Sequence, residues 1–240
     1  FISIYLKTEK FFDITGTVAV LSMIYVAISH TYNLSSRAII LASLCCIWTI
    51  RLGIFLLYRV HKRKKDRRFD QIKESKSDFL ITWELSAAWT LITISCALCA
   101  ITSTKEATIK SIDYILIFGW LAAFTTEACA DYQKNKFKDK KTKNQFIQTG
   151  LWKYCRHPNY FGEITMWIFI AGLALPSLHS AAYITLASPL FVYWLLTKVS
   201  GINILEAQNE KQYGHLAEYQ KYKAQTPKLL PFKKILNLKK

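Results

Sequence analysis

The segment from Thr149 to Glu163 gathers hydrogen-bonding side chains at the start of a long apolar stretch. Pro158 can occupy the first turn of a helix, where its missing N–H has no cost. Asn159 and Glu163 then lie one turn apart on one face of that helix. Bulk packing does not require so many polar groups at a helix entrance, so the segment predicts a site for a ligand with several hydrogen-bonding groups. Its polar members are Arg156, His157, Asn159, Tyr160 and Glu163.

A second set of charged residues lies upstream, at spacings of four, three and four positions: Glu127, Asp131, Lys134 and Lys138. This spacing places all four on one face of a continuous helix. We expect that helix to extend beyond the membrane surface, with the acidic pair at the interface and the basic pair above it. Two lysines one turn apart suit a phosphate-bearing ligand, but lysines that reach toward lipid headgroups show the same pattern.

The elements that position these residues are predicted to be membrane-spanning helices. Each apolar stretch is close to the roughly 20 residues that a helix needs to cross about 30 Å of hydrocarbon. We therefore predict an all-α, multi-pass integral membrane bundle of about six transmembrane helices, forming one domain over residues 1–240. The stretches are 11–30, 37–58, 79–102, 112–131, 160–177 and 181–199.

The charge distribution supports this topology. The 240 residues are 52% hydrophobic, yet their formal net charge is +16. With six spans, 27 of the 32 Lys and Arg residues fall on one side of the membrane, in the segment before the first span and in 59–77, 132–159 and 201–240. By the positive-inside rule, that side faces the cytosol or its organellar equivalent. Such segregation argues against a nucleic-acid partner, because a soluble basic protein gains charge at the expense of apolar residues.

The cysteines predict no metal site. Cys96 and Cys99 have the spacing of zinc ligands, but neither a histidine nor a second cysteine pair accompanies them. Packing inside the membrane is the expected role of this pair.

The run Arg156-His157-Pro158-Asn159-Tyr160-x-Gly162-Glu163, preceded by Gly150-Leu151-Trp152, resembles the signature of the membrane steroid 5-alpha-reductase-like family. It is most similar to an uncharacterised branch with a steroid reductase C-terminal domain. The signature alone is shared with sterol reductases and isoprenylcysteine methyltransferases. Further resemblances extend the match from about Arg51 to Pro231: Arg51-Leu52, Asp66–Phe69, Glu127–Lys138, Ser200–Glu206 and Tyr213–Pro227.

This resemblance implies a helical bundle that holds NADPH at its cytosolic side and takes a lipophilic substrate from the bilayer. The implied reaction is hydride transfer to a C=C bond of a steroid, sterol or other unsaturated lipid. The cofactor-binding part would span residues 127–231, with Lys134, Lys138 and Arg156 where a phosphate is expected. Residues that would contact the cofactor are Lys134, Lys138, Trp152, Arg156, His157, Asn159, Tyr160, Glu163, Glu206, Tyr213 and Tyr219.

Candidates for the catalytic donor that polarises the substrate are Glu84 and Tyr58, in or beside early spans. Each has an equally plain structural role: Glu84 as the ion-pair partner of Arg51, and Tyr58 as an interfacial aromatic residue.

Two other functions are compatible with these motifs. One is a noncatalytic structural or lipid-binding subunit of a larger membrane assembly. The other is a membrane methyltransferase that uses S-adenosylmethionine. The endoplasmic reticulum and the mitochondrial inner membrane are both compatible locations.

Overall fold

The computed structural model describes residues 12–63, 75–105, 107–140, 142 and 145–231, and within these the side chains of all but Lys76 and Phe79. It is 81% helical, without strands in the described ranges. The first residue of the first predicted span, most of the loop 59–77 and the family-like run Asp66–Phe69 lie outside them.

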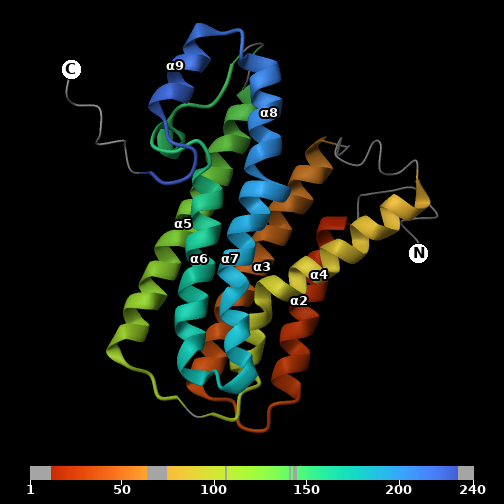
Figure 1. Ribbon diagram of the computed structural model, residues 1–240, viewed down its shortest axis with the longest axis vertical. Coiled ribbons are helices and arrows are strands. Elements are labelled where there is room, and N and C mark those ends of the chain that lie inside the picture. Colours follow the sequence, from red (N-terminus) through yellow and green to blue (C-terminus); the bar gives the residue numbers. More distant parts are fainter. Residues whose placement is uncertain (1–11, 64–74, 106, 141, 143–144, 232–240) are drawn as a thin grey trace. The chain divides into compact units, whose positions relative to one another are not determined.

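Six helical segments are long and apolar enough to cross a membrane (Figure 1). The predicted all-α fold with six spans is thereby confirmed, and the chain is a multi-pass membrane protein. The predicted ends differ most in the fourth and sixth spans, where helix continues beyond the apolar stretch. The segments are Phe12–Ser29, Ser36–Lys62, Leu80–Ile101, Ser111–Lys140, Pro158–Ser177 and Ser180–Tyr213.

The chain divides into two compact units. Unit 1 comprises residues 1–110 and 171–188, and unit 2 comprises residues 111–170 and 189–240. In unit 1, three long helices contact one another, and the third also contacts the 3-10 helix η5 (Ser180–Ala187). The three helices are α2 (Phe12–Ser29), α3 (Ser36–Arg63) and α4 (Lys76–Ile101).

A buried arginine organises one end of unit 1. Arg37, in the first turn of α3, is only 1% exposed. Its Nη1 donates to the carbonyl of Leu173 at 2.9 Å, and its Nη2 donates to that of Thr108 at 2.8 Å. A carbonyl from the last turn of α6 and one from the loop before Ser111 thus satisfy a charge whose burial would otherwise be costly.

Unit 2 holds the segments that the sequence analysis singled out. Its longest helix, α5 (Ser111–Lys140), has 30 residues and so extends about 45 Å. This length confirms that the fourth span continues past the hydrocarbon. The other elements, of which residues 171–174 and Ser188 are assigned to unit 1, are η3 (Gly150–Lys153), α6 (Pro158–Ala174), α7 (Ser188–Trp194), the π-helix η6 (Leu195–Val199), α8 (Ile202–Tyr213) and α9 (Ala217–Gln225).

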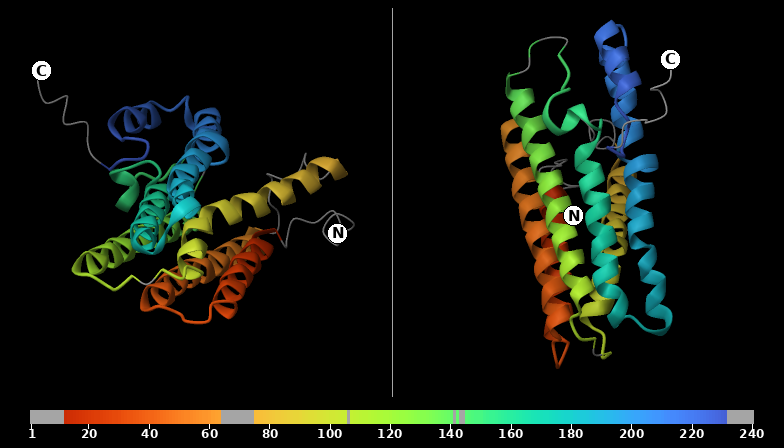
Figure 2. Two further views of the ribbon diagram at one scale, coloured as in Figure 1. Left: turned by 60° about the horizontal axis from the view of Figure 1, so that its bottom comes forward. Right: turned by 90° about the vertical axis from the view of Figure 1, so that its left-hand side faces the viewer.

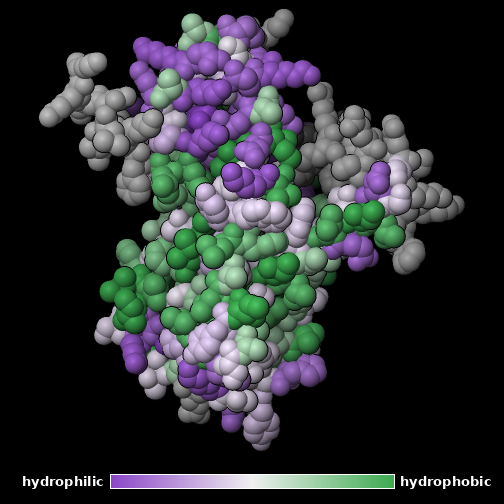
Figure 3. Space-filling view, viewed as in Figure 1, coloured by the Kyte–Doolittle hydropathy of each residue, from purple (hydrophilic) through white to green (hydrophobic). Residues whose placement is uncertain are grey.

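Polarity is segregated along unit 2. Hydrophilic side chains gather over α9 and the adjoining ends of α5 and α8, whereas apolar side chains cover the middle of the long helices (Figure 3). The polar signature before α6 therefore lies at the transition between an apolar and a hydrophilic surface.

Helices α5 and α6 run side by side (Figure 2), and at Gly162 their backbones lie close together. A Cβ built there would lie 2.7 Å from the Ala123 carbonyl oxygen and 2.7 Å from the Glu127 amide nitrogen. Because both atoms belong to the α5 backbone, no side-chain movement could relieve the overlap. The glycine of the signature is thus required by helix packing.

We predict that Gly162→Ala destabilises the protein by about 1–3 kcal/mol, the usual cost of overpacking. The matched control is Gly16→Ala in α2, because a Cβ at that position meets nothing within 4 Å. Thermal unfolding in detergent, followed by tryptophan fluorescence, measures both variants. Equal melting temperatures for them would contradict the close approach of α5 and α6.

Candidate functional site

The junction between α5 and η3 positions the start of the signature. Gly150 has a φ of +62°, a left-handed conformation that glycine adopts readily. Beside it, the amide of Leu151 donates to Gln133 Oε1 at 2.9 Å, and Trp152 Nε1 donates to the carbonyl of Ala130 at 3.1 Å. The Trp152 ring consequently lies against α5, where Lys134 Nζ is 4.9 Å from its centroid. The structure thus brings together Lys134 and Trp152, two of the residues that the sequence analysis assigned to the cofactor.

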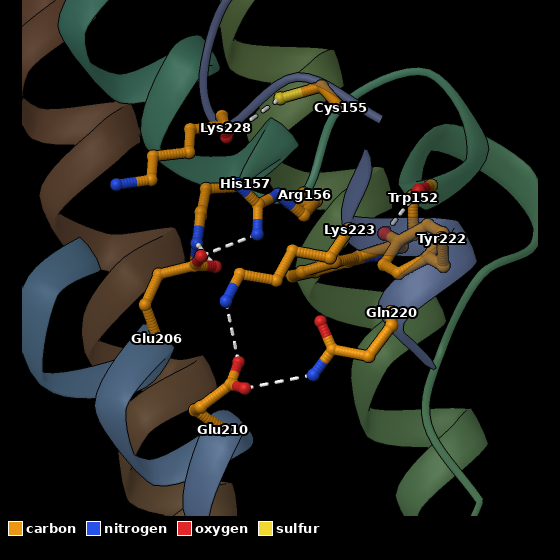
Figure 4. A network of polar contacts seen from close by, with 10 residues as sticks. All are labelled: Trp152, Cys155, Arg156, His157, Glu206, Glu210, Gln220, Tyr222, Lys223 and Lys228. Atoms are coloured by element: carbon orange, nitrogen blue, oxygen red, sulfur yellow. Dashed lines mark hydrogen bonds and ion pairs between the residues drawn. The ribbon is translucent and has the colours of Figure 1, made fainter. Parts of the chain in front are cut away.

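The carboxylate of Glu206, on α8, joins the signature through both of its oxygens (Figure 4). Arg156 Nη1 donates to Oε2 at 2.5 Å, and His157 Nε2 lies 2.9 Å from Oε1. Arg156 is 8% exposed and His157 only 2%. Three predicted cofactor-binding residues, from segments about 50 positions apart, therefore form one buried network.

The chain after α9 covers the signature from another side. The amide of Arg156 donates to the carbonyl of Pro227 at 2.9 Å, and Cys155 Sγ lies 2.8 Å from the carbonyl oxygen of Leu229. Tyr222 Oη donates to the carbonyl of Trp152 at 2.6 Å. Burial raises the pKa of the Cys155 thiol to about 11, so it remains protonated and can serve as a donor.

An aromatic cluster completes this end of unit 2. The Phe146 ring lies 5.2 Å from that of Tyr219, 5.5 Å from that of Tyr222 and 5.8 Å from that of Tyr213. Phe146 and Tyr222 were absent from the predicted site. A lone phenylalanine in the polar segment before Gly150 was the available signal for Phe146.

A second carboxylate orients the start of α6. Asn159 Nδ2 donates to Asp131 Oδ1 at 3.2 Å, across the contact between α5 and α6. Nearby, the rings of His157 and Tyr160 are stacked, with centroids 5.8 Å apart and an angle of 10° between their planes. Through His157, Tyr160 therefore lies beside the Glu206 network.

Four buried polar atoms in these segments have no hydrogen-bond partner within the described part of the chain: Arg156 Nε, His157 Nδ1, Asn159 Oδ1 and Tyr219 Oη. An unsatisfied buried polar group costs about 1–3 kcal/mol, and native structures contain few of them. All four belong to residues that the sequence analysis assigned to cofactor binding. They can supply both donors and acceptors to a bound molecule.

The remaining predicted residues are not drawn into this network by the contacts described. Lys138 is exposed on α5, and Glu163 is half-buried on α6. The catalytic candidates both belong to unit 1, where Glu84 is exposed on α4 and Tyr58 Oη accepts from Lys62 Nζ at 3.4 Å. Their catalytic role stays a prediction.

The fold defines a helical multi-pass membrane protein, and unit 2 holds a cluster of buried polar residues around the Glu206 carboxylate. The chain belongs to the family described as a protein of unknown function, DUF1295, whose model matches residues 1–226. No curated protein and no solved structure matches it.

Burial lowers the pKa of His157 below its usual value, and this effect outweighs the opposing influence of the Glu206 carboxylate. The unfolded chain therefore binds the proton more readily than the folded one. We predict that the melting temperature falls as the pH drops below about 6.5, the usual histidine pKa. Thermal unfolding between about pH 7.5 and about pH 5.5 tests this, and the fall should be smaller in His157→Gln. His215→Gln, at an exposed position, is the control; an equal fall in His157→Gln would contradict the prediction.

Proposed function

We propose that this protein is an NADPH-dependent oxidoreductase that reduces a C=C bond of a steroid, sterol or other unsaturated lipid. The observation that carries the proposal is the set of four unpartnered polar atoms on residues that the steroid 5-alpha-reductase-like signature assigns to the cofactor. The likeness of the signature to that family depends on residue types, whereas the burial of these atoms depends on packing. The two therefore support the proposal separately.

The donor set fits a dinucleotide. Lys134 supplies a half-buried positive charge beside the Trp152 ring, as a phosphate-bearing ligand requires. Arg156, His157, Asn159 and Tyr219 supply neutral hydrogen-bonding capacity, because the charge of Arg156 is already compensated by Glu206. Phosphate recognition is therefore expected mainly from the lysines of α5.

The chemistry supplied by NADPH, when bound, is a hydride for an electron-poor double bond. The protein's own residues bind and orient the ligands and exclude water from them. Burial of Trp152, Tyr213 and Tyr219 keeps their surroundings dry. The apolar surface of the long helices gives a lipid a route from the bilayer. An acidic or phenolic group would polarise the double bond of the lipid.

One observation favours the noncatalytic alternative. The Arg156–Glu206–His157 network pairs its charges without any ligand, as a purely structural network would. A structural subunit would bind neither NADPH nor S-adenosylmethionine and would co-purify stoichiometrically with a larger membrane assembly.

We predict that the purified protein binds NADPH and that Lys134→Ala weakens binding about tenfold, through loss of one charge-assisted contact. Lys136→Ala is the matched control, because Lys136 is exposed on the same helix and lies over Tyr132 instead. Fluorescence titration with NADPH, and separately with S-adenosylmethionine, measures the dissociation constants. If the protein binds S-adenosylmethionine but not NADPH, the reductase proposal is wrong and the methyltransferase alternative is supported.

A further inference from the structure

Two carboxylates determine which hydrogen-bonding atoms the site offers. A carboxylate only accepts hydrogen bonds, so each group bound to one must direct an N–H toward it. Asp131 receives Asn159 Nδ2 at 3.2 Å, and Glu206 receives His157 Nε2 at 2.9 Å. The opposite atom of each side chain is then fixed as an acceptor.

These opposite atoms are the unpartnered ones. With Nδ2 committed to Asp131, Asn159 presents Oδ1, which accepts. With Nε2–H committed to Glu206, neutral His157 presents Nδ1 as a bare lone pair. The lowered pKa of buried His157 is consistent with the neutral ring. The unpartnered Nε of neighbouring Arg156 is a donor.

This pattern discriminates between ligand groups. A phosphate presents mainly acceptors and would oppose the lone pairs of His157 and Asn159. Ribose hydroxyls rotate, so each can either donate or accept a hydrogen bond. They therefore do not require protein atoms that are fixed as acceptors. A primary carboxamide carries two N–H donors and one carbonyl acceptor in a plane, which complements two acceptors and a donor.

We infer that Asp131 and Glu206 are positioning residues that fix Asn159 and His157 as acceptors, so that this part of the site takes a carboxamide rather than a phosphate. The identification of that carboxamide with the nicotinamide of NADPH rests on the proposed function. Within unit 2, the signature would then bind the nicotinamide end of the cofactor, and the lysines of α5 would bind its phosphates.

The tautomer of His157 can be measured whether or not NADPH binds. We expect nitrogen NMR spectra of the full-length protein, labelled with ¹⁵N-histidine and held in nanodiscs near neutral pH, to show His157 with Nε2 protonated and Nδ1 bare. Comparison with His157→Gln assigns the signals. A protonated Nδ1 in the wild-type protein would overturn the inference.

The carboxamide is tested with the 3-acetylpyridine analogue of NADPH, in which a methyl group replaces the amide nitrogen and its two donors. We expect the wild-type protein to bind NADPH at least about tenfold more tightly than the analogue. In Asp131→Asn, where the Asn159 amide can turn, this ratio should fall to about twofold or less. The control Asp139→Asn makes the same chemical change at an exposed position of α5 and should keep the wild-type ratio.

The outcomes separate the two proposals. Failure to bind NADPH would reject the proposed function. The NMR measurement of the His157 tautomer would then still test whether Nδ1 is an acceptor. Tight binding of NADPH with equal affinity for the analogue would support the proposed function and overturn the carboxamide. A merely structural role of Asp131 would change the affinities for NADPH and for the analogue by the same factor. If Asp131→Asn keeps the wild-type ratio of these two affinities, the positioning role of Asp131 is overturned.

Discussion

The polar end of unit 2 depends on the carboxylate of Glu206. It lies between a guanidinium and an imidazole that are almost fully buried, and removal of one partner of a buried pair typically costs about 3–5 kcal/mol. The carboxylate therefore ties α8 to the signature, while Pro227 pairs with the amide of Arg156 and extends the same arrangement to the chain after α9. The same contacts engage Arg156 Nη1 and His157 Nε2, so Arg156 Nε and His157 Nδ1 are the atoms that the network does not pair.

Helix α5 is the other half of this arrangement. It donates no side chain to the Glu206 network in the contacts described, yet it docks Trp152 through the carbonyl of Ala130 and orients Asn159 through Asp131. The contact with Asn159 requires the backbones of α5 and α6 to approach closely, which a glycine at position 162 permits. Helix α5 thus holds both η3 and the start of α6 in place.

The sequence was sufficient for the features that depend on local patterns. Apolar length predicted the six spans, and the four, three, four spacing predicted one continuous helix through Lys138, which α5 contains. Contacts between distant segments could not be derived in this way. Residue types made Glu206 a candidate, but its pairing with Arg156, 50 positions away, is a product of tertiary packing. Phe146 and Arg37 were missed for the same reason: each becomes central only when remote segments meet it.

The pairing of Arg156 changes how the positive charge of the chain should be interpreted. Among the basic residues near the signature, an arginine is ordinarily the first candidate for a phosphate, because its planar donors match phosphate oxygens. Here the Glu206 carboxylate compensates that charge, and the edge left over offers a single Nε donor. Under the proposed function, attraction for an anion would therefore come mainly from other basic residues. Lys134, half-buried beside Trp152, is placed to supply it, whereas the signature contributes directional hydrogen bonds.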